Sequence, residues 1–551
     1  MNRTTHTATA PRRARRVPAR FLAAAAGLAL LAGCSTAAAE PAATSSGTAS
    51  SATTAVTTSA TSDAGTLTEA LAGLAEAHSV EDVDASAAVD VTLDGAAVTT
   101  SAAQDALRVE EGAQGTTVTI TAGGTYRLTG SLNGQVVIDV PDDDTDAAKV
   151  TLLLDGATIT SATTSAIAAV SADEVTVALA EGSANALSDG ASYGSGTDEP
   201  NAALYSTADL TILAVGDATG SLSVTGAAND GIASTDGLVL ASGTVTVTAA
   251  DDAVRGKDYL VMRGGTLTAS AGGHALKSDN TDDATLGYVA LLGGTADITT
   301  SGATAEDGVN ATTVLAGSLE SPLTVTVEAA DDGLHADGAM IVDGAALTVT
   351  GSYEGLEAAQ LTIAGGTLDI TAEDDALNMS SGAATGGGPE AVDGGANVTI
   401  TGGDITLTTA NGDGFDSNGT ATMTGGSLTV NGPVMNGNGA IDVPGGFTIS
   451  GGTLAAGGSA GMAEAPEAGS AQGWVSLAFS SPAGAGSLVE VADADGTVLA
   501  SYTPATDVYS VILSAAGIVD GETYTVTVDG TELGTVTAGE HSGGMGPGGR
   551  P

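Results

Sequence analysis

A short acidic turn recurs along the middle of this sequence and constrains the fold more than any other feature. Its form is one or two acidic residues, then Gly or Ala, then an aliphatic or aromatic residue, as in Asp331-Asp332-Gly333-Leu334. The second position of the turn is occupied in order by Asp230, Asp252, His274, Asp307, Asp332, Glu354, Asp375 and Asp413. Successive copies are therefore 22, 22, 33, 25, 22, 21 and 38 residues apart.

Between the turns the sequence predicts short strands rather than helices. Segments such as Val245-Thr246-Val247-Thr248 alternate at period two and are rich in β-branched residues. A unit of about 22 residues made of strands and tight turns is the repeat of a β-solenoid. Leucine-rich repeats need a helical half that is missing, and a β-sandwich has no reason to repeat one turn at a fixed interval. We therefore expect an all-β parallel β-helix, in which the two longest steps carry inserted loops.

Composition divides the chain into five predicted segments. Residues 1–34 form an export signal, and residues 35–62, almost entirely Ser, Thr, Ala and Gly, form a disordered tether. The β-helix is predicted over residues 63–470. Residues 471–540 contain Trp474 and Tyr524 among strand-like runs, and we expect a small β cap there, because a solenoid end needs cover for its open edge. Residues 541–551 form a Gly-rich disordered tail.

The N-terminus is typical of a bacterial lipoprotein. Five arginines between Arg12 and Arg20 precede the apolar run Phe21–Leu31, which leads into Leu31-Ala32-Gly33-Cys34. The run is far shorter than the roughly 20 residues that a membrane-spanning helix needs. We expect lipid on Cys34, the only cysteine in the chain, and therefore an exported protein anchored to the cell membrane and facing the extracellular side. The paired arginines leave the choice between general and twin-arginine export open.

The predicted mature chain is strongly acidic. All 66 Asp and Glu follow Cys34, whereas six of the 14 Lys and Arg precede it, so its formal charge is 8 − 66 = −58. Such a surface repels the phosphates of nucleic acid, which we exclude as a partner. A hydrophobic fraction of 42% and a positive mean hydropathy argue against disorder as the reason for the charge. The sequence therefore predicts a folded protein with an acidic exterior.

The repeated carboxylates predict calcium sites. Equivalent side chains of a β-helix lie roughly 4.8 Å apart in neighbouring coils, and Ca²⁺ takes six to eight hard oxygen ligands in flexible geometry. With one cysteine and few histidines, zinc is not favoured. The alternative is that the turns merely carry solvated charge. The predicted calcium ligands are Asp230, Asp251, Asp252, Glu306, Asp307, Asp331, Asp332, Glu354, Asp374 and Asp375.

A second set of polar residues follows the aliphatic residue of each turn. If that residue points inward, period-two geometry turns the next side chain outward. The position is occupied by Ala233, Arg255, Lys277, Asn310, His335, Glu357, Asn378 and Asp416. Basic residues crowd near its start, where they either grip carboxylates of an acidic glycan or merely neutralise nearby acids. The predicted ligand-binding residues are Arg255, Lys257, Lys277, Asp279, Asn310, His335 and Glu357.

Several ordered motifs resemble a known family. They are Asn201–Tyr205, Asn229–Gly237, Asp251–Asp258, Leu276–Asn280 and Gly351–Glu357. Over roughly residues 80 to 540 the chain is similar to a family of bacterial carbohydrate-binding-domain lipoproteins. The resemblance implies a right-handed parallel β-helix, similar in shape to polysaccharide lyases, that binds calcium and plant-type polysaccharides such as pectin-like acidic chains and cellulose.

The sequence thus favours a non-catalytic, calcium-dependent binder of acidic polysaccharide at the cell surface. The alternative is a calcium-dependent lyase of polyuronates, in which Arg255 or Lys277 removes the proton next to the uronate carboxylate. Neighbouring carboxylates oppose this role because they stabilise the charged form of the base. A second alternative is a structural adhesin or spacer without glycan affinity.

Overall fold

The computed structural model describes residues 65–542, except 102, 104, 142–145, 191–192, 194–199, 303–305 and 384–390. The predicted export signal with Cys34, the tether and most of the predicted tail lie outside the described residues. The described part is nearly all β, which confirms that prediction, and belongs to one compact unit. Its helices are α1 (Gly65–Leu71) and the 3₁₀ turns η1 (Ala85–Ala87) and η2 (Asp146–Ala148). None of these helices has the length and apolarity needed to cross a bilayer.

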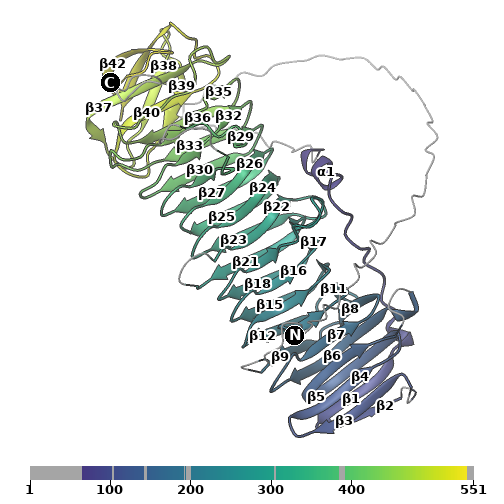
Figure 1. Cartoon of the computed structure of the whole chain (residues 1–551). Coiled ribbons are helices and arrows are strands. Elements are labelled where there is room, and N and C mark those ends of the chain that lie inside the picture. Colours follow the sequence, from purple (N-terminus) through teal and green to yellow (C-terminus); the bar gives the residue numbers. More distant parts are fainter. Residues whose placement is uncertain are drawn as a thin grey trace, which may run out of the picture. The chain divides into compact units, whose positions relative to one another are not determined.

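Most strands join one sheet of 38 strands, in which strands of successive repeats pair in parallel (Figure 1). For example, β15 (Thr244–Ala249) pairs on one side with β12 (Ser221–Gly226) and on the other with β18 (Thr266–Ala271). Thr244 is therefore opposite Thr266, 22 residues later, which is also the commonest spacing of the acidic turns. The pairings sort the strands into three columns.

The first column contains β7 (Ile167–Ser171), β10 (Ala202–Ser206), β13 (Asp230–Ser234), β16 (Val254–Gly256), β19 (Leu276–Ser278), β22 (Val309–Gly317), β24 (Leu334–Asp343), β26 (Leu356–Ile363), β28 (Leu377–Met379), β31 (Phe415–Ser417) and β34 (Ile441–Asp442). The second contains β8 (Glu174–Leu179), β11 (Asp209–Ala214), β14 (Gly237–Leu240), β17 (Tyr259–Met262), β20 (Tyr288–Leu291), the later parts of β22, β24 and β26, β29 (Asn397–Ile400), β32 (Thr420–Met423) and β35 (Phe447–Ile449). The third contains β9 (Ala184–Ser188), β12, β15, β18, β21 (Gly294–Thr300), β23 (Leu323–Glu328), β25 (Ala345–Gly351), β27 (Gly366–Ala372), β30 (Asp404–Thr409), β33 (Ser427–Asn431) and β36 (Thr453–Gly458).

Further strands lie at the two ends of the columns. The N-terminal strands are β1 (Val89–Gly95), β2 (Ala97–Thr100), β3 (Leu107–Gly112), β4 (Gly115–Ile120), β5 (Gly124–Asp139) and β6 (Val150–Thr160). The C-terminal strands are β37 (Trp474–Ala483), β38 (Val489–Ala492), β39 (Val498–Tyr502), β40 (Val508–Ser514), β41 (Thr523–Val528) and β42 (Thr531–Thr537). They lie within the range predicted for the cap, and β40 pairs antiparallel with β36, which covers the last edge of the third column.

The core runs through the columns because alternate residues of each strand point inward. In β15, Val245 and Val247 are buried, whereas the three threonines between and beside them are exposed. Aliphatic residues of one repeat stack on those of the next, and this cluster extends from Val91 in β1 to Ile512 in β40. The longest repeat carries its extra residues mainly between the first and second columns, after β28, and the 33-residue repeat carries them both after β19 and after β21.

Residues 65–88 precede the first strand and lie over the outer side of the second column, although the sequence predicts the β-helix from residue 63. We call this segment the strap. That side is apolar, and Leu67 of α1 is fully buried there over β22 and β24. The Tyr288 hydroxyl donates to the carbonyl of Ala75 (2.8 Å), and His78 Nδ1 lies 2.8 Å from the Tyr259 hydroxyl. Some side chains that point outward from the second column are apolar. The strap covers them and so removes this apolar strip from water.

Candidate functional site

The second-position residues of the acidic turns lie next to one another at the start of the first column, as the repeat predicts. Backbone hydrogen bonds join each turn to the next, for example from Gly308 N–H to the Asp332 carbonyl and from Gly333 N–H to the Glu354 carbonyl, both 2.9 Å. We call this set the acidic file. It contains Asp230, Asp252, His274, Asp307, Asp332, Glu354, Asp375 and Asp413.

Glycine in the turn allows this close stacking. A Cβ on Gly355 would lie 2.3 Å from the carbonyl oxygen of Ala376, and one on Gly333 would lie 2.5 Å from that of Gly355. Real Cβ atoms do not approach a backbone oxygen so closely, so a side chain at either position would push two repeats apart. Glycine is therefore a packing requirement at Gly333 and Gly355, although alanine fills the same position of the turn at Ala253, Ala275 and Ala376.

The side chains of the file also hold the next repeat in place. The backbone N–H of His274 donates to Asp252 Oδ1 (3.0 Å), and that of Asp332 donates to Asp307 Oδ1 (3.2 Å). Where His274 replaces the acid, its Nδ1 accepts the N–H of Asp307 (3.0 Å), which places the ring proton on Nε2. The side chains of Asp375 and Asp413 accept a backbone N–H of the next repeat in the same way, so in these five repeats the position needs an acceptor.

The outward residues that follow the turns form a second line beside the file. The register places each opposite its predicted neighbour in the next repeat. We call this line the polar stripe. Its members, in order, are Ala233, Arg255, Lys277, Asn310, His335, Glu357, Asn378, Asp416 and Asp442. All of them after Ala233 are partly buried.

At the basic end of the stripe the charges are paired within the protein. One guanidinium nitrogen of Arg255 lies 2.8 Å from Asp279, and Lys277 Nζ lies 3.1 Å from Asp252. Burial lowers the pKa of Arg255, but the charge and hydrogen bond of Asp279, together with the charges of Asp230 and Asp252, outweigh burial and leave the pKa above its usual value. Lys257 lies at the corner after β16 and makes no ion pair within the described part of the chain. The basic side chains therefore neutralise nearby acids, and an anionic ligand would have to compete with Asp279 and Asp252 for them.

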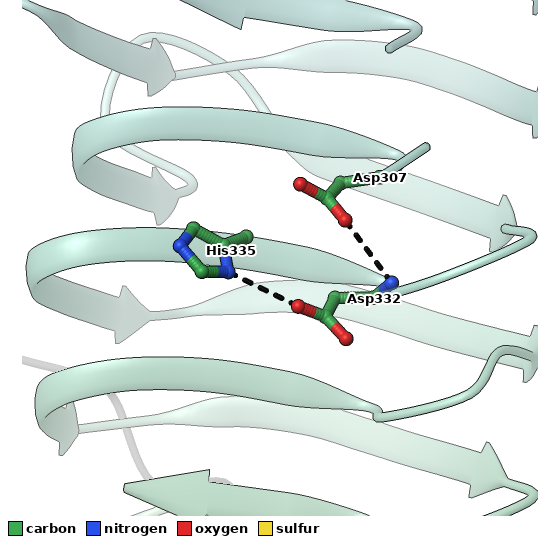
Figure 2. Close-up of side chains that lie close together, drawn as sticks. All are labelled: Asp307, Asp332 and His335. Carbon is green, nitrogen blue, oxygen red and sulfur yellow. Dashed lines mark hydrogen bonds and ion pairs between the residues drawn. The ribbon is translucent and has the colours of Figure 1, made fainter. Parts of the chain in front are cut away.

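In the middle of the stripe a histidine joins two carboxylates. His335 Nδ1 lies 2.7 Å from Glu357 Oε2 and 3.0 Å from Asp332 Oδ2. Figure 2 shows the contact between His335 and Asp332, with Asp307 of the preceding repeat beside it. Hydrogen bonds to these two carboxylates raise the pKa of His335 to about 11, so the ring is charged at neutral pH. Burial raises the pKa of Asp332 to about 7 despite this partner. The stripe also supplies Asn310, which donates to Asp307 (2.7 Å).

At the acidic end carboxylates gather without a basic partner. Oxygens of Asp375, Asp413 and Asp416 lie within 4.8 Å of one another. Burial, and after it the neighbouring carboxylates, raises the pKa of Asp375 and of Asp413 to about 7 and that of Asp416 to about 9. Among the residues that the structure places, none forms an ion pair with these three. Ionising all three is therefore costly unless a cation is bound.

A neutral oxygen lies between these acids and the middle of the stripe. Asn378 donates through Nδ2 to Glu354 Oε2 (2.8 Å), while its Oδ1 is buried and accepts no hydrogen bond from the described residues. Burial raises the pKa of Glu354 to about 7. Carboxylate and amide oxygens in such a group are the donors that Ca²⁺ prefers.

The predicted calcium ligands divide into two sets. Asp307, Asp332, Glu354 and Asp375 belong to groups whose oxygens or nitrogens lie within 4.8 Å, together with His335, Glu357, Asp413 and Asp416. The other predicted ligands fall outside such groups: Asp230 accepts a hydrogen bond from Asn201 and Asp252 pairs with Lys277, while the remaining four occupy the first turn position. These four are Asp251, Glu306, Asp331 and Asp374.

Two residues of the densest acidic group, Asp413 and Asp416, were not among the predicted ligands. The signal for them is present, since Asp413 holds the second turn position and Asp416 the stripe position of the same repeat. Gly412 replaces the acid at the first position, which makes this copy of the turn look weaker than it is.

The comparisons with known proteins concern the part of the chain that carries the file and the stripe. Residues 114–437 match the model of a family described as carbohydrate-binding domain-containing protein, and this range is more than half of the chain. The protein therefore belongs to the family of carbohydrate-binding domain-containing proteins, as the motifs predict. The match includes the acidic file from Asp230 to Asp413 and excludes the strap and the C-terminal strands.

One relative and one solved structure resemble the chain. A carbohydrate-binding domain-containing protein of Acetivibrio thermocellus (strain ATCC 27405) is 42% identical over 185 residues, which are 33% of this chain and 62% of the relative. The chain thus spans less than two thirds of that relative's length. A gadolinium derivative of a polysaccharide lyase-like protein from C. thermocellum is 27% identical with a TM-score of 0.42, over 47% of this chain and 98% of that chain.

Proposed function

We propose that this protein is a cell-surface binder of acidic polysaccharide that depends on calcium, built as a right-handed parallel β-helix whose three sides are the three columns. Membership of the carbohydrate-binding domain-containing family supports a carbohydrate as the ligand. Parallel pairing of each strand with its counterpart in the next repeat supports the helix. The calcium and the acidity of the glycan rest on the side chains of the file and the stripe.

The observation that carries the proposal is the unbalanced charge at the acidic end. Carboxylates 4.8 Å apart repel by about 0.9 kcal/mol in water and by about 3.5 kcal/mol at the dielectric typical of a protein surface. Asp375, Asp413 and Asp416 stand within that distance, with no cationic side chain bonded to them in the described part of the chain. A divalent cation would relieve this repulsion and, with ligand positions left over, would also hold a carboxylate of the glycan.

The residues best placed to hold calcium are the acids of two groups, with the free oxygen of Asn378 on the stripe between them. Oxygens of Asp375, Asp413 and Asp416 lie within 4.8 Å of one another, and those of Asp332, Glu354 and Glu357 form a second such group. Three carboxylates, together with water or sugar oxygens, can complete a shell of six to eight ligands around one ion. Magnesium is less suited, because it demands stricter octahedral geometry.

The pairing at the basic end favours binding over polysaccharide cleavage. A lyase base must give up its own proton before it can take one from the sugar. Arg255 is bonded to Asp279 and its pKa is raised, and Lys277 is bonded to Asp252. Arg255 therefore keeps its proton, and the Lys277 amine is engaged with a carboxylate, so neither residue is suited to act as a base.

The N-terminal sequence supports placing this binder at the cell surface. Lipid on Cys34 would anchor the chain, and the residues up to Gly65 would separate the folded part from the membrane. The acidic exterior is compatible with a glycan partner only where cations or basic side chains bridge the charges. An acidic polysaccharide such as polygalacturonate is therefore the ligand that best fits calcium dependence.

Calorimetric titration of the chain with polygalacturonate, in calcium and then in a chelator, tests the proposal. We expect binding in calcium that the chelator abolishes and that the variant Asp413→Asn/Asp416→Asn greatly weakens. Asp297→Asn, which removes an exposed acid from β21, is the matched control and should bind as the wild type does. Calcium-independent binding, or full binding by the double variant, would contradict the proposal. A sustained rise in absorbance from unsaturated products would show a lyase instead.

A further inference from the structure

The polar stripe changes its charge from one end to the other. Arg255 and Lys277 stand at its start, Asn310 and His335 follow, and beyond them the stripe is acidic or neutral. Six register steps separate Arg255 from Asp416, so the line extends for roughly 29 Å at 4.8 Å a step. Since the members are opposite one another in register, the gradient lies along a single line rather than over different faces.

The two ends offer different chemistry to the same anionic group. At the start, one nitrogen of Arg255 makes both contacts with Asp279, and the buried Nε of Arg255 has no hydrogen-bond acceptor. The Asp279 side chain is 34% exposed, so an incoming carboxylate can reach the pair and compete for the guanidinium. At the other end Asp416 and its neighbours would repel that carboxylate, unless a bound cation lies between them.

We propose, resting on the proposed function, that one linear polyuronate lies along the stripe in a single orientation. One segment of the chain contacts Arg255 and Lys277 directly, and a later segment is held through calcium near Asn378 and Asp416. A polysaccharide chain has a reducing and a non-reducing end, so the sugar ring presents its carboxylate differently when the chain is reversed. The strands of the stripe run parallel, so the stripe has a direction of its own and meets the two orientations of the sugar chain with different geometry. Only one orientation then suits both the basic side chains at one end and the calcium at the other.

Paramagnetic broadening tests the orientation. The chain has one cysteine, so with Cys34→Ser a spin label can be attached at one added cysteine. Asp282→Cys places it in the exposed corner after β19, near the basic end, and Met435→Cys in the exposed segment before β34, near the acidic end. The NMR signal of the reducing-end proton of an oligogalacturonate long enough to span the stripe is then followed in calcium.

We expect one of the two labels to broaden that signal and the other to leave it sharp. Equal broadening by both, with binding intact, would overturn the orientation and leave the proposed function standing. Absence of any binding in calcium would overturn the proposed function itself, and the orientation with it. The two failures are therefore distinguishable in one set of samples.

A charge-matched pair of variants tests whether the basic end takes part. Lys277→Gln should weaken binding of the spanning oligogalacturonate roughly tenfold, because a contact with the charged ligand is lost. Arg108→Gln removes the same charge from an exposed position on β3, away from the stripe, and should leave affinity unchanged. Equal affinity of both variants and the wild type would refute a role for the basic end. If Lys277→Gln does not fold, the two spin-labelled proteins still decide the orientation.

Discussion

Replacing Asp416 by Asn should stabilise the protein without calcium and destabilise it with calcium. Burial and nearby carboxylates raise the pKa of Asp416 to about 9, whereas an unfolded chain has a value of about 3.9. A carboxyl with a raised pKa in the folded state contributes most at pH values below the unfolded pKa. That contribution is lost as pH rises toward the folded pKa.

The magnitude follows from proton linkage. Asp416 stays protonated in the folded chain at pH values where it is already ionised in the unfolded chain. In that range the free energy of unfolding falls by about 1.4 kcal/mol for each unit that the pH rises. Between roughly pH 5 and 8, the free energy of unfolding of the calcium-free wild type should therefore fall with pH more steeply than that of Asp416→Asn, by up to this slope. Over the three pH units from about 5 to 8 this slope amounts to about 4 kcal/mol, which is how much more stable than the wild type the variant should become over that range.

Urea denaturation followed by far-ultraviolet circular dichroism measures both effects. In calcium the order should reverse, because the substitution removes one anionic ligand and only the wild type keeps the full free energy of calcium binding. Asp297→Asn, an exposed acid on β21, should show neither the change in slope nor the reversal. The reasoning would be refuted if Asp416→Asn lost stability in the absence of calcium and kept the wild-type dependence on pH.

Three further predictions concern the neighbours of this group and the strap. His335→Gln leaves Asp332 and Glu357 without their cation and should cost about 3 kcal/mol in urea unfolding at neutral pH. Since the pKa of His335 is raised to about 11, the wild-type contribution is complete below about pH 6.5 and is lost progressively as pH rises from there through about 11, so a contribution that does not change over this range would contradict the ion pairs. Gly355→Ala should lower the free energy of unfolding by about 1–3 kcal/mol, because its Cβ would meet the Ala376 carbonyl. Gly351→Ala is the control, since a Cβ there has nothing within 4 Å. Equal melting temperatures of the two variants would argue against close stacking. Leu67→Ala should weaken the packing of the strap on the second column by about 2–5 kcal/mol, because a fully buried side chain is lost. Limited proteolysis before Val89 should then become faster. Unchanged cleavage would show that this side chain does not hold the strap.

The sequence predicts the alignment of the repeats well, for a physical reason. A turn that must supply an acceptor to the next repeat and a glycine to let it approach leaves a pattern at fixed spacing, and His274 fits that pattern because Nδ1 also accepts. The register of the stripe from Arg255 to Asp416 follows from the same spacing. Local pattern and stacking geometry therefore agree along the whole file.

Other features depend on contacts that spacing does not determine. Whether Arg255 binds a ligand or neutralises an acid depends on Asp279, 24 residues away, and on where a long side chain turns. Asp413 was missed as a predicted ligand because Gly412 weakens the turn motif. The strap has no period, and its place is decided by an apolar strip on the second column that includes Val239 and Val261, which strand alternation does not explain.

The aligned acids of successive repeats should recruit a divalent cation. Calorimetric titration of the chelator-treated protein with calcium measures this binding. We predict saturable calcium binding that is lost in Asp413→Asn/Asp416→Asn and retained in Asp297→Asn. Absence of calcium binding by the wild type, or unchanged binding by the double variant, would contradict the claim.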